Sequence, residues 1–335
     1  MEETQNILRD SFGRDHSYLR ISLTELCNLR CTYCMPAEGI ALSPKSHIMT
    51  YEEVYNIAKI FVKHGVSKIR LTGGEPLVRK DADVIIEKLA SLPVELSLTT
   101  NAVLVDRFIE IFKTNGIRTI NVSLDSLDPD KFLQITRRNN FDKVYKNIML
   151  LVNEGFKVKL NVVLMKGFND NEIIDFIELT KDLPIVIRFI EFMPFSGNQW
   201  NKEKLVSLQY ILETVDKSYD ESTIMRLTDA PNDTSKNYQI ENYKGSFAII
   251  SSITNPFCDS CNRIRLTANG QLKNCLFSTT ESDLLTQYRA GENIEPIIQK
   301  TIQAKYKMRG GMDTNKKLED ASLHAQNRSM ITIGG

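Results

Sequence analysis

Apolar residues recur along the first two-thirds of the chain with two alternating periods, one typical of β-strands and one typical of helices. Six short stretches rich in Ile, Leu and Val fit strands. They lie at residues 18–24, 67–73, 94–100, 118–124, 157–164 and 185–192. Between them, apolar residues repeat every three or four positions, which predicts helices. The pattern therefore predicts a β-α unit that is repeated about six times.

The first predicted helix shows how these helices are bounded. Thr50 and Glu53 fit a capping box before an apolar stripe, and Gly65 follows the stripe where the helix would end. Similar stripes precede Gly116 and Gly155, and further helices are expected at 79–91 and 170–182. Strands that alternate with helices indicate a parallel sheet with helices outside it. Because six strands are fewer than the eight of a closed barrel, we expect an α/β fold with a partial (β/α)6 TIM-type barrel, with a doubly wound sheet as the alternative.

The pattern changes after about residue 195, so we expect a barrel domain at 1–195 and a C-terminal α+β extension at 196–335. The last 25 or so residues are polar and rich in turn-forming residues. The other elements expected in the extension are a loop at 195–200, a helix at 207–216, a polar linker at 228–237, strands at 245–253, 263–268 and 270–277, and a helical stretch near 283–308.

The charge balance argues against one class of partner. Lys plus Arg and Asp plus Glu both number 42 among 335 residues, so the net charge is zero. A protein that coats nucleic acid needs a basic face. No stretch reaches the roughly 18 apolar residues of a membrane span, and the polar start MEETQNILRD does not fit a signal peptide. We therefore expect a cytoplasmic protein without nucleic-acid or membrane partners, in which cysteines serve metal or redox roles.

Cys27, Cys31 and Cys34 form a C-x3-C-x2-C pattern directly after the first predicted strand. A structural zinc site with a distant fourth ligand is one interpretation, and inert buried thiols are another. The clustering of three cysteines on a loop favours an iron–sulfur cluster. A [4Fe–4S] cluster usually takes four thiolates, so three cysteines would leave one iron open for chemistry.

Cys258, Cys261 and Cys275 form a second triad. A C-x2-C pair alone also occurs in zinc knuckles and redox pairs. All six cysteines of the chain fall into the two triads, which favours a second [4Fe–4S] cluster that also has an open iron.

Arg263 and Arg265 lie on a predicted strand between the last two of these cysteines. Alternate residues of a strand point the same way, so both guanidinium groups project from one face. That face is either solvated or a clamp for a phosphate group, which arginine binds with paired, permanently charged donors.

The first triad resembles that of the radical S-adenosylmethionine (SAM) enzymes, in which this cysteine pattern follows the first strand of a partial barrel. The GGEP segment at 73–76 fits the same superfamily, and its glycines can expose backbone groups to a ligand. The resemblance implies that the open iron chelates SAM and that cleavage of SAM gives a 5′-deoxyadenosyl radical. The SAM contacts that it implies are Tyr33, Gly74, Ser123 and Met193.

The whole chain resembles one family of these enzymes, molybdenum cofactor biosynthesis protein A, the GTP 3′,8-cyclases. The shared segments run nearly end to end and include FGR at 12–14, LRISLTELCNLRCTYCMP at 19–36, RLTGGEPL at 70–77, LTTN at 98–101, INVSLDSLD at 120–128, KLNVVLMKG at 159–167, RFIEFM at 188–193 and the terminal RSMITIGG. The segment FCDSCNRIRL at 257–266 is the most specific to this family.

This second resemblance implies a GTP site, with the guanine on the open iron of the second cluster. The implied GTP contacts are Arg20, Arg70, Thr99, Lys159, Arg263, Ile264 and Arg265. No side chain is expected to be the catalyst, because the SAM-derived radical would abstract the ribose 3′ hydrogen and lead to 3′,8-cyclo-7,8-dihydro-GTP. The terminal Gly334 and Gly335 would reach into the site.

The resemblance also implies partners and one local difference. An external low-potential electron donor such as flavodoxin or ferredoxin is expected, and molybdenum cofactor biosynthesis protein C would take the product. Relatives are often dimeric, so a homodimer is expected too. Where the family reads TTNG, this chain has Ala102, so the turn is either ordinary or remodelled.

Two alternatives stay open. Another radical SAM enzyme with an auxiliary cluster, such as a peptide maturase, would share the first triad but would not need the arginines for phosphate. A non-catalytic protein with two structural metal sites would normally close each site with a fourth ligand.

Overall fold

A computed structural model describes residues 6–36 and 38–334 of the protein. Among these residues, twelve strands form one sheet in the order β12-β11-β10-β1-β2-β3-β4-β5-β6-β9-β8-β7. The six predicted strands are parallel neighbours at its centre. They are β1 (Tyr18–Ser22), β2 (Lys68–Thr72), β3 (Glu95–Thr100), β4 (Thr119–Ser123), β5 (Lys157–Leu164) and β6 (Val186–Glu191). Their predicted positions are confirmed to within two residues.

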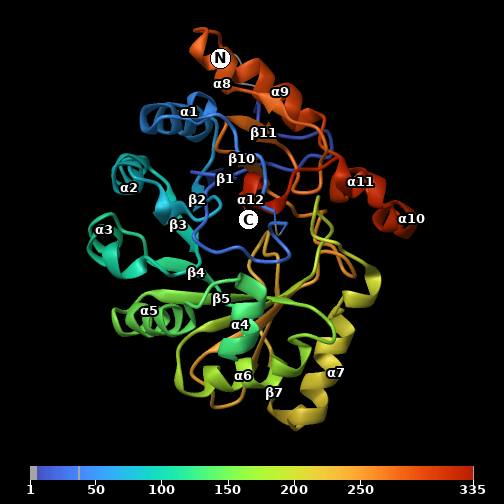
Figure 1. Ribbon diagram of the computed structural model, residues 1–335. Coiled ribbons are helices and arrows are strands. Elements are labelled where there is room, and N and C mark those ends of the chain that lie inside the picture. The colour runs from blue at the N-terminus through green and yellow to red at the C-terminus, as the bar shows by residue number, and fades with distance from the viewer. Residues whose placement is uncertain (1–5, 37, 335) are drawn as a thin grey trace.

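The helices between these strands cover the outer side of the sheet, and α1, α2, α3 and α5 lie in a row there (Figure 1). These helices are α1 (Tyr51–Lys63), α2 (Ala82–Ala90), α3 (Ile109–Thr114), α5 (Phe141–Asn153) and α6 (Ile173–Asp182). The predicted capping box is confirmed: Thr50 Oγ1 accepts from the Glu53 N–H at 3.2 Å, and Glu53 Oε2 accepts from the Thr50 N–H at 2.7 Å. This reciprocal pair satisfies two N–H groups that a helix start leaves without partners.

One helix of the barrel segment is not predicted by the apolar pattern. In α4 (Pro129–Thr136), only Phe132, Ile135 and Thr136 are buried, so the periodic signal is too short to read. The helix is set by its start instead. Asp128 Oδ1 accepts from the N–H groups of the first turn, and Pro129 supplies the helical φ at its first position.

The segment after residue 195 adds strands to both edges of the central six. β9 (Ser246–Ile250) pairs in parallel with β6, and β10 (Arg263–Leu266) pairs in parallel with β1. The sheet therefore has eight consecutive parallel strands. Antiparallel pairs extend it on both sides with β11 (Gln271–Lys273), β12 (Ser282–Asp283), β8 (Lys236–Ile240) and β7 (Ile224–Arg226). The division of the chain at residue 195 stays a prediction.

The remaining helices are short. They are α7 (Leu208–Ser218), α8 (Leu285–Arg289), α9 (Glu295–Gln303), α10 (Asn315–Glu319), α11 (Ala321–Ala325) and α12 (Met330–Ile333). The helical stretch expected near 283–308 is split into α8 and α9, because Gly291 between them has a φ of +79° that breaks a helix. Single 3-10 turns occur at Lys45–His47, Pro76–Val78, Val105–Arg107, Asp170–Glu172, Lys202–Lys204, Glu221–Thr223 and Arg309–Gly311. No helix of the described ranges is long and apolar enough to cross a membrane.

The two faces of the central sheet differ in chemistry. Residues such as Leu19, Ile69 and Leu98 point toward the helices and are fully buried in the main hydrophobic core. Their neighbours along each strand point the other way and are polar or charged. The register aligns these polar residues across strands, so Arg20 lies beside Arg265 of β10 on one side and Arg70 of β2 on the other. The chain ends on this polar side, where α12 lies at the centre of the molecule (Figure 1).

Candidate active site

The polar face of the parallel strands borders a cavity of about 550 Å³. All six cysteines line it, so both triads face the same space. The predicted SAM contacts Tyr33, Gly74, Ser123 and Met193 line it as well, as do the predicted GTP contacts Arg20, Arg70, Thr99, Lys159, Arg263 and Arg265. The structure thus brings together residues that lie far apart in the sequence, from Arg20 near the start of the chain to Cys275.

The loop that carries the first triad is anchored on α4. The N–H groups of Arg30 and Thr32 donate to the carbonyls of Thr136 and Ile135, both at 2.9 Å. Arg137, which ends α4 in a left-handed conformation, returns a guanidinium bond to the Arg30 carbonyl at 3.3 Å. These contacts fix the loop from outside the cavity and leave the thiols facing inward.

The thiols of the first triad lie close to one another in a buried setting. Burial raises the pKa of Cys27 to about 11 and raises that of Cys34 further. Burial also raises the pKa of Cys31, and the neighbouring Cys34 and Cys27 add to this by repulsion between thiolates. Thiols held neutral in this way would lose their protons to the solvent when they bind the irons of a cluster.

The glycines of GGEP are required by chain packing as much as by a ligand. A Cβ on Gly74 would lie 2.3 Å from the Leu26 carbonyl oxygen, and one on Gly73 would lie 2.8 Å from the Thr24 oxygen. The Gly74 N–H donates to that Thr24 oxygen at 2.7 Å. The turn after β2 therefore presses against the segment that leads into the first triad, and only glycine allows this approach.

Glu75 of the same motif connects the turns after β2 and β3. Its carboxylate accepts from Thr100 Oγ1 at 2.8 Å, from the Asn101 N–H at 2.7 Å and from the Leu77 N–H at 3.1 Å. Burial raises its pKa to about 7, although these bonds oppose the shift. Asn101 Nδ2 in turn lies 3.7 Å from Cys27 Sγ, so the carboxylate helps to place the side chain that contacts the first triad.

Tyr33 is held in the cavity wall by an acid that the sequence reasoning missed. Its Oη donates to Asp125 Oδ2 at 2.8 Å, and the other Asp125 oxygen accepts from the Val163 N–H at 2.8 Å. Burial raises the pKa of Asp125 to about 6. The signal for this residue was present in the segment INVSLDSLD, where Asp125 follows Ser123 at the end of a strand.

Ala102 keeps the conformation that favours glycine. Its φ is +62°, and its side chain is fully buried. Thr100 Oγ1 accepts from its N–H at 3.0 Å, and Asn147 Nδ2 donates to its carbonyl at 2.7 Å. Packing thus holds an alanine in a left-handed turn at a cost of about 1 kcal/mol. Thr99 still lines the cavity, so the substitution leaves the strand end in place.

The second triad comes from two loops. Cys258 and Cys261 lie between β9 and β10, and Cys275 follows β11. Burial raises the pKa of Cys258, and the other two thiols add to this. Cys261 differs: burial opposes ionisation, but Arg263 and Lys305 outweigh it and lower the pKa to about 6. Lys305 Nζ lies 3.5 Å from Cys261 Sγ.

All six cysteines are free thiols that are partly buried. None of the six forms a disulfide. No group of three His, Cys, Asp or Glu side chains in the described ranges is arranged to hold a single metal ion. A cluster distributes its thiolate bonds over several irons, so its ligands need not converge on one point.

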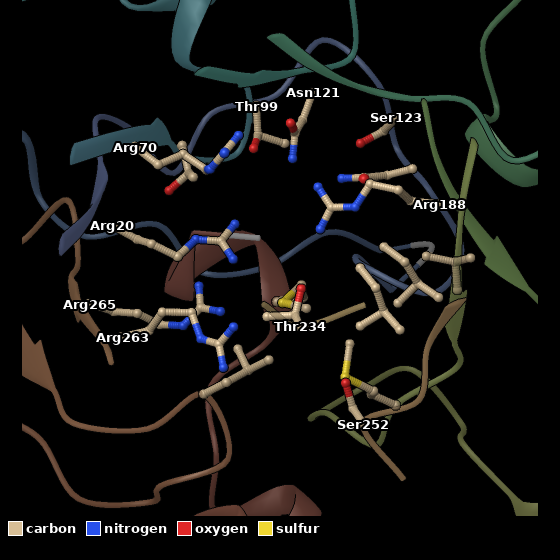
Figure 2. Close-up of a pocket in the computed structure, with 18 of the residues that line it drawn as sticks. Arg20, Arg70, Thr99, Asn121, Ser123, Arg188, Thr234, Ser252, Arg263 and Arg265 are labelled. Carbon is tan, nitrogen blue, oxygen red and sulfur yellow. The ribbon is translucent and has the colours of Figure 1, made fainter. Parts of the chain in front are cut away.

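The cations of the cavity repel one another. Figure 2 shows the guanidinium groups of Arg20, Arg70, Arg188, Arg263 and Arg265 directed into one space. Burial, aided by repulsion from Arg263, lowers the pKa of Arg265 to about 10. Burial also lowers the pKa of Arg20, with Arg265 as the next cause. Such a group of like charges is stabilised when an anion enters it.

Arg188 is a cavity cation that the sequence reasoning did not assign. Burial and repulsion from Arg70 lower its pKa to about 10. Its place in the motif RFIEFM is the signal, because it alternates with the core residue Phe189 and so must face the cavity. In the described ranges, eight arginines and lysines line the cavity against three carboxylates, so it carries strong positive potential.

Several buried polar atoms of the cavity have no hydrogen-bond partner among the described residues. They are Thr99 Oγ1, Asn121 Oδ1, Asn161 Oδ1 and Arg188 Nε. Buried polar groups are rarely left unpaired, because this costs roughly 1–3 kcal/mol each. Their convergence on one cavity indicates a large polar ligand with both donors and acceptors.

Residues 230–234 of the predicted linker also line the cavity, which the sequence reasoning did not expect. They form the tip between β7 and β8. Burial and repulsion from Arg188 lower the pKa of Lys159, and Asp233 of this tip opposes the shift. A polar linker pattern gives no sign that the segment folds back over the sheet.

The structure places the Ile264 side chain away from the cavity. Its side chain is fully buried in the main core, on the face of β10 opposite to Arg263 and Arg265. Alternation along a strand forces this arrangement. Only its backbone lies between the two arginines.

The C-terminal segment reaches the polar face of the sheet, as the resemblance implied. The Gly334 carbonyl accepts from Arg265 Nη1 at 2.7 Å. A Cβ on Gly334 would lie 2.6 Å from Thr72 Oγ1 and 2.9 Å from Ser22 Cβ, so a side chain would not fit. Gly335 lies outside the described residues.

Comparisons with known proteins agree with this geometry. Residues 21–180 match the family model "Radical SAM superfamily", and residues 185–310 match "Molybdenum Cofactor Synthesis C". The radical SAM match implies a [4Fe–4S] cluster and SAM. Among solved structures, SuiB of Streptococcus suis is similar with a TM-score of 0.61 at 18% identity, over 86% of this chain and 67% of SuiB. That likeness concerns the fold, an α/β fold of the radical SAM type.

Curated relatives are more similar in sequence. The mitochondrial GTP 3′,8-cyclase of Arabidopsis thaliana is 46% identical, over 98% of this chain and 84% of the relative. The GTP 3′,8-cyclase of Listeria monocytogenes is 39% identical, over 98% of this chain and 99% of the relative. The molybdenum cofactor biosynthesis protein moc-5 of Caenorhabditis elegans is 46% identical over 93% of this chain. This chain spans about half the length of moc-5 and of several other curated relatives. The chain therefore belongs to the GTP 3′,8-cyclase family of the radical SAM superfamily.

Proposed function

We propose that this protein is a GTP 3′,8-cyclase, which converts GTP to 3′,8-cyclo-7,8-dihydro-GTP for molybdenum cofactor biosynthesis. One observation carries the proposal: a single cavity is lined by both cysteine triads and by the arginines and lysine predicted to bind GTP. A nucleoside triphosphate is polar and anionic, which matches the converging cations and the unpaired polar atoms of the cavity wall.

In this proposal each part of the wall has its own role. Cys27, Cys31 and Cys34 would hold the cluster that binds SAM, and the other triad would hold a second [4Fe–4S] cluster. When bound, SAM and the first cluster supply the radical chemistry at the ribose 3′ carbon. The protein would orient both molecules and keep water away from the reacting atoms.

The arginines would bind the triphosphate. Arg20, Arg70 and Arg265 form a row across three strands. Arg263 lies two residues before Arg265 on β10, and Lys159 lies on β5. Rigid strands hold these cations before the substrate arrives, so little ordering is needed on binding. Tyr33, placed by Asp125, together with Gly74, Ser123 and Met193, would contact SAM.

Further parts of the proposal concern the whole protein. The eight parallel strands would act as an open, partial barrel around the cavity, with residues 196–335 supplying the second cluster. A low-potential donor such as flavodoxin or ferredoxin would supply the electron, and molybdenum cofactor biosynthesis protein C would take the product.

The test is anaerobic incubation of the iron-loaded protein with SAM, a reductant and GTP. We expect 5′-deoxyadenosine to form only when GTP is present, together with the cyclised nucleotide detected by mass spectrometry. Cys275→Ala should abolish the cyclised product. Release of 5′-deoxyadenosine with a peptide and not with GTP would favour the peptide maturase instead, and colourless, zinc-loaded protein would rule out both enzymes.

A further inference from the structure

The segment before β1 contains a turn closed by two buried side chains, to which the proposed reaction gives no role. Asp10 and Arg14 close this turn, in which the Asp10 N–H donates to the Arg14 carbonyl at 3.1 Å. Asp10 Oδ1 accepts from the N–H groups of Phe12 and Arg14, both at 3.0 Å. Gly13 between them has a φ of +78°, which the tight turn requires. The FGR motif at 12–14 therefore builds a compact structure that presents one arginine.

The Arg14 guanidinium joins three parts of the chain. Its Nε donates to Asp10 Oδ2 at 2.6 Å. Its Nη1 donates to the carbonyls of Cys258 at 2.8 Å and Lys307 at 2.9 Å, and its Nη2 donates to the Tyr306 carbonyl at 3.0 Å. Only 8% of the side chain is exposed, so these bonds are made away from bulk water. Asp10 holds the planar group in the orientation that reaches all three carbonyls.

The three bonds to carbonyls bear on the second triad. The bond to the Cys258 carbonyl fixes the backbone of one triad cysteine. The bonds to residues 306 and 307 fix the segment that starts at Lys305, whose Nζ lies 3.5 Å from Cys261 Sγ and 2.9 Å from the Arg263 carbonyl. Arg14 thus holds Cys258 directly. It holds Lys305, the cation beside Cys261, through the segment at 305–307.

We propose that Arg14 is a positioning residue for the second iron–sulfur cluster: it ties the Cys258 loop to the 305–307 segment so that the three thiols face one cluster. This inference rests on the proposed second cluster. Lysine could not replace it fully, because a single ammonium group cannot bond three separate carbonyls and a carboxylate in one plane. The nearby Arg9 offers a matched control, because among the described residues its guanidinium pairs with Asp15 alone, at the exposed surface.

The test uses chains in which only one triad can hold iron. In a chain with Cys27, Cys31 and Cys34 all changed to Ala, iron and sulfide are supplied anaerobically, and iron per chain and the electron paramagnetic resonance spectrum are measured. We expect Arg14→Ala to lower bound iron at least fivefold, Arg14→Lys to retain a part of it, and Arg9→Ala to leave iron and spectrum unchanged. In the reciprocal chain, with Cys258, Cys261 and Cys275 changed to Ala, Arg14→Ala should keep full iron.

The outcomes separate this inference from the proposed function. Equal iron with and without Arg14 at the second triad would overturn the positioning role. Loss of iron from both chains would also overturn it, because it would show a general effect on folding. A parent chain whose second triad binds no iron would overturn both proposals. Arg14-dependent iron in a protein that does not cyclise GTP would support this inference and sink only the proposed function.

Discussion

Single residues in the cavity wall favour a bound anion and destabilise the protein without one. Arg188 is the clearest example, because it is half-buried, its pKa is lowered to about 10, and its buried Nε has no hydrogen-bond partner among the described residues. Desolvation of this cation and its repulsion from Arg70 outweigh the attraction of Asp233, so Arg188 raises the free energy of the folded state. Its retention is explained if the substrate provides the negative charge.

Replacement of this arginine should therefore affect binding and stability in opposite directions. We expect Arg188→Met to weaken GTP binding about 30-fold, or ~2 kcal/mol, because the triphosphate loses a desolvated partner. The same change should raise the free energy of unfolding of the metal-free protein, since repulsion with Arg70 is removed. Anaerobic titration calorimetry and urea unfolding measure the two effects. Arg289→Met, at an exposed ion pair with Glu53, is the control and should leave GTP binding unchanged.

For Ile264 we expect an effect on stability and none on GTP binding, unlike for its two arginine neighbours. Because its side chain lies in the core, Ile264→Val should lower the free energy of unfolding by about 1 kcal/mol and leave the Kd for GTP unchanged. Arg263→Ala should instead weaken GTP binding and leave the free energy of unfolding unchanged. A clear loss of GTP affinity in Ile264→Val, with unchanged stability, would contradict the structure.

These cases show what the sequence can reveal about single residues. The cysteine triads and Arg263 with Arg265 could be found, because their spacing is unusual and chemically specific. Arg188 and Asp125 carry a weaker signal in their motifs, since a charged residue beside an apolar neighbour near a strand end also fits a solvated face. Ile264 was assigned through the resemblance, although strand alternation already placed it opposite the arginines.

At the scale of secondary-structure elements, the turns after β2 and β3 act as one unit through Glu75. Its pKa of about 7 is raised from the usual 4.5, so the folded protein holds this proton more tightly than the unfolded chain does. Stability linked to Glu75 is therefore fully present below about pH 4.5 and is lost as the pH rises toward 7.

Replacing Glu75 with a residue that does not titrate should remove this dependence of stability on pH. In the metal-free protein, we expect the free energy of unfolding to fall between pH 4.5 and pH 7 by on the order of 2–3 kcal/mol more than in Glu75→Gln. Urea unfolding at four pH values across this window measures both slopes. Asp175→Asn, on α6, serves as a control for the loss of a carboxylate. Equal slopes in the protein and in Glu75→Gln would show that the carboxylate does not titrate in this range.

The elements themselves were predictable to different degrees for a physical reason. The six central strands and α1 are marked by long apolar patterns and by caps, which report burial on one face. In contrast, α4 buries only three residues, β7 is only three residues long and β8 is largely polar, so their sequences look like loops. Such elements form because they pair or pack with residues that are distant in the sequence, and a local sequence pattern does not identify those residues.

At the scale of the whole molecule, the two ends of the chain complete one sheet. β10 covers the free edge of β1, and β9 covers the free edge of β6. These pairings could not be read from the sequence, because strands 245 positions apart carry no local signal for each other, as Tyr18 and Arg263 illustrate. The eight-stranded parallel core is therefore a property of the complete chain.

This arrangement predicts how the two halves behave when separated. We expect residues 1–195 alone to be insoluble or partly unfolded, because the edges of β1 and β6 and the polar face between them lose their cover. Co-expression with residues 196–335 should restore a soluble complex, which size-exclusion chromatography and circular dichroism can detect. A soluble fragment 1–195 with a cooperative melting transition would show instead that residue 195 is a boundary between independent domains.

The pairing of β1 with β10 also has a consequence for synthesis in the cell. At about 5 to 20 residues per second, a ribosome needs roughly 12 to 50 s to make the 245 residues between these partners. Throughout that interval the growing chain carries a strand whose hydrogen-bonding groups are free to recruit other nascent chains. Chaperone supply during translation should therefore limit the yield of this protein more than its final stability does.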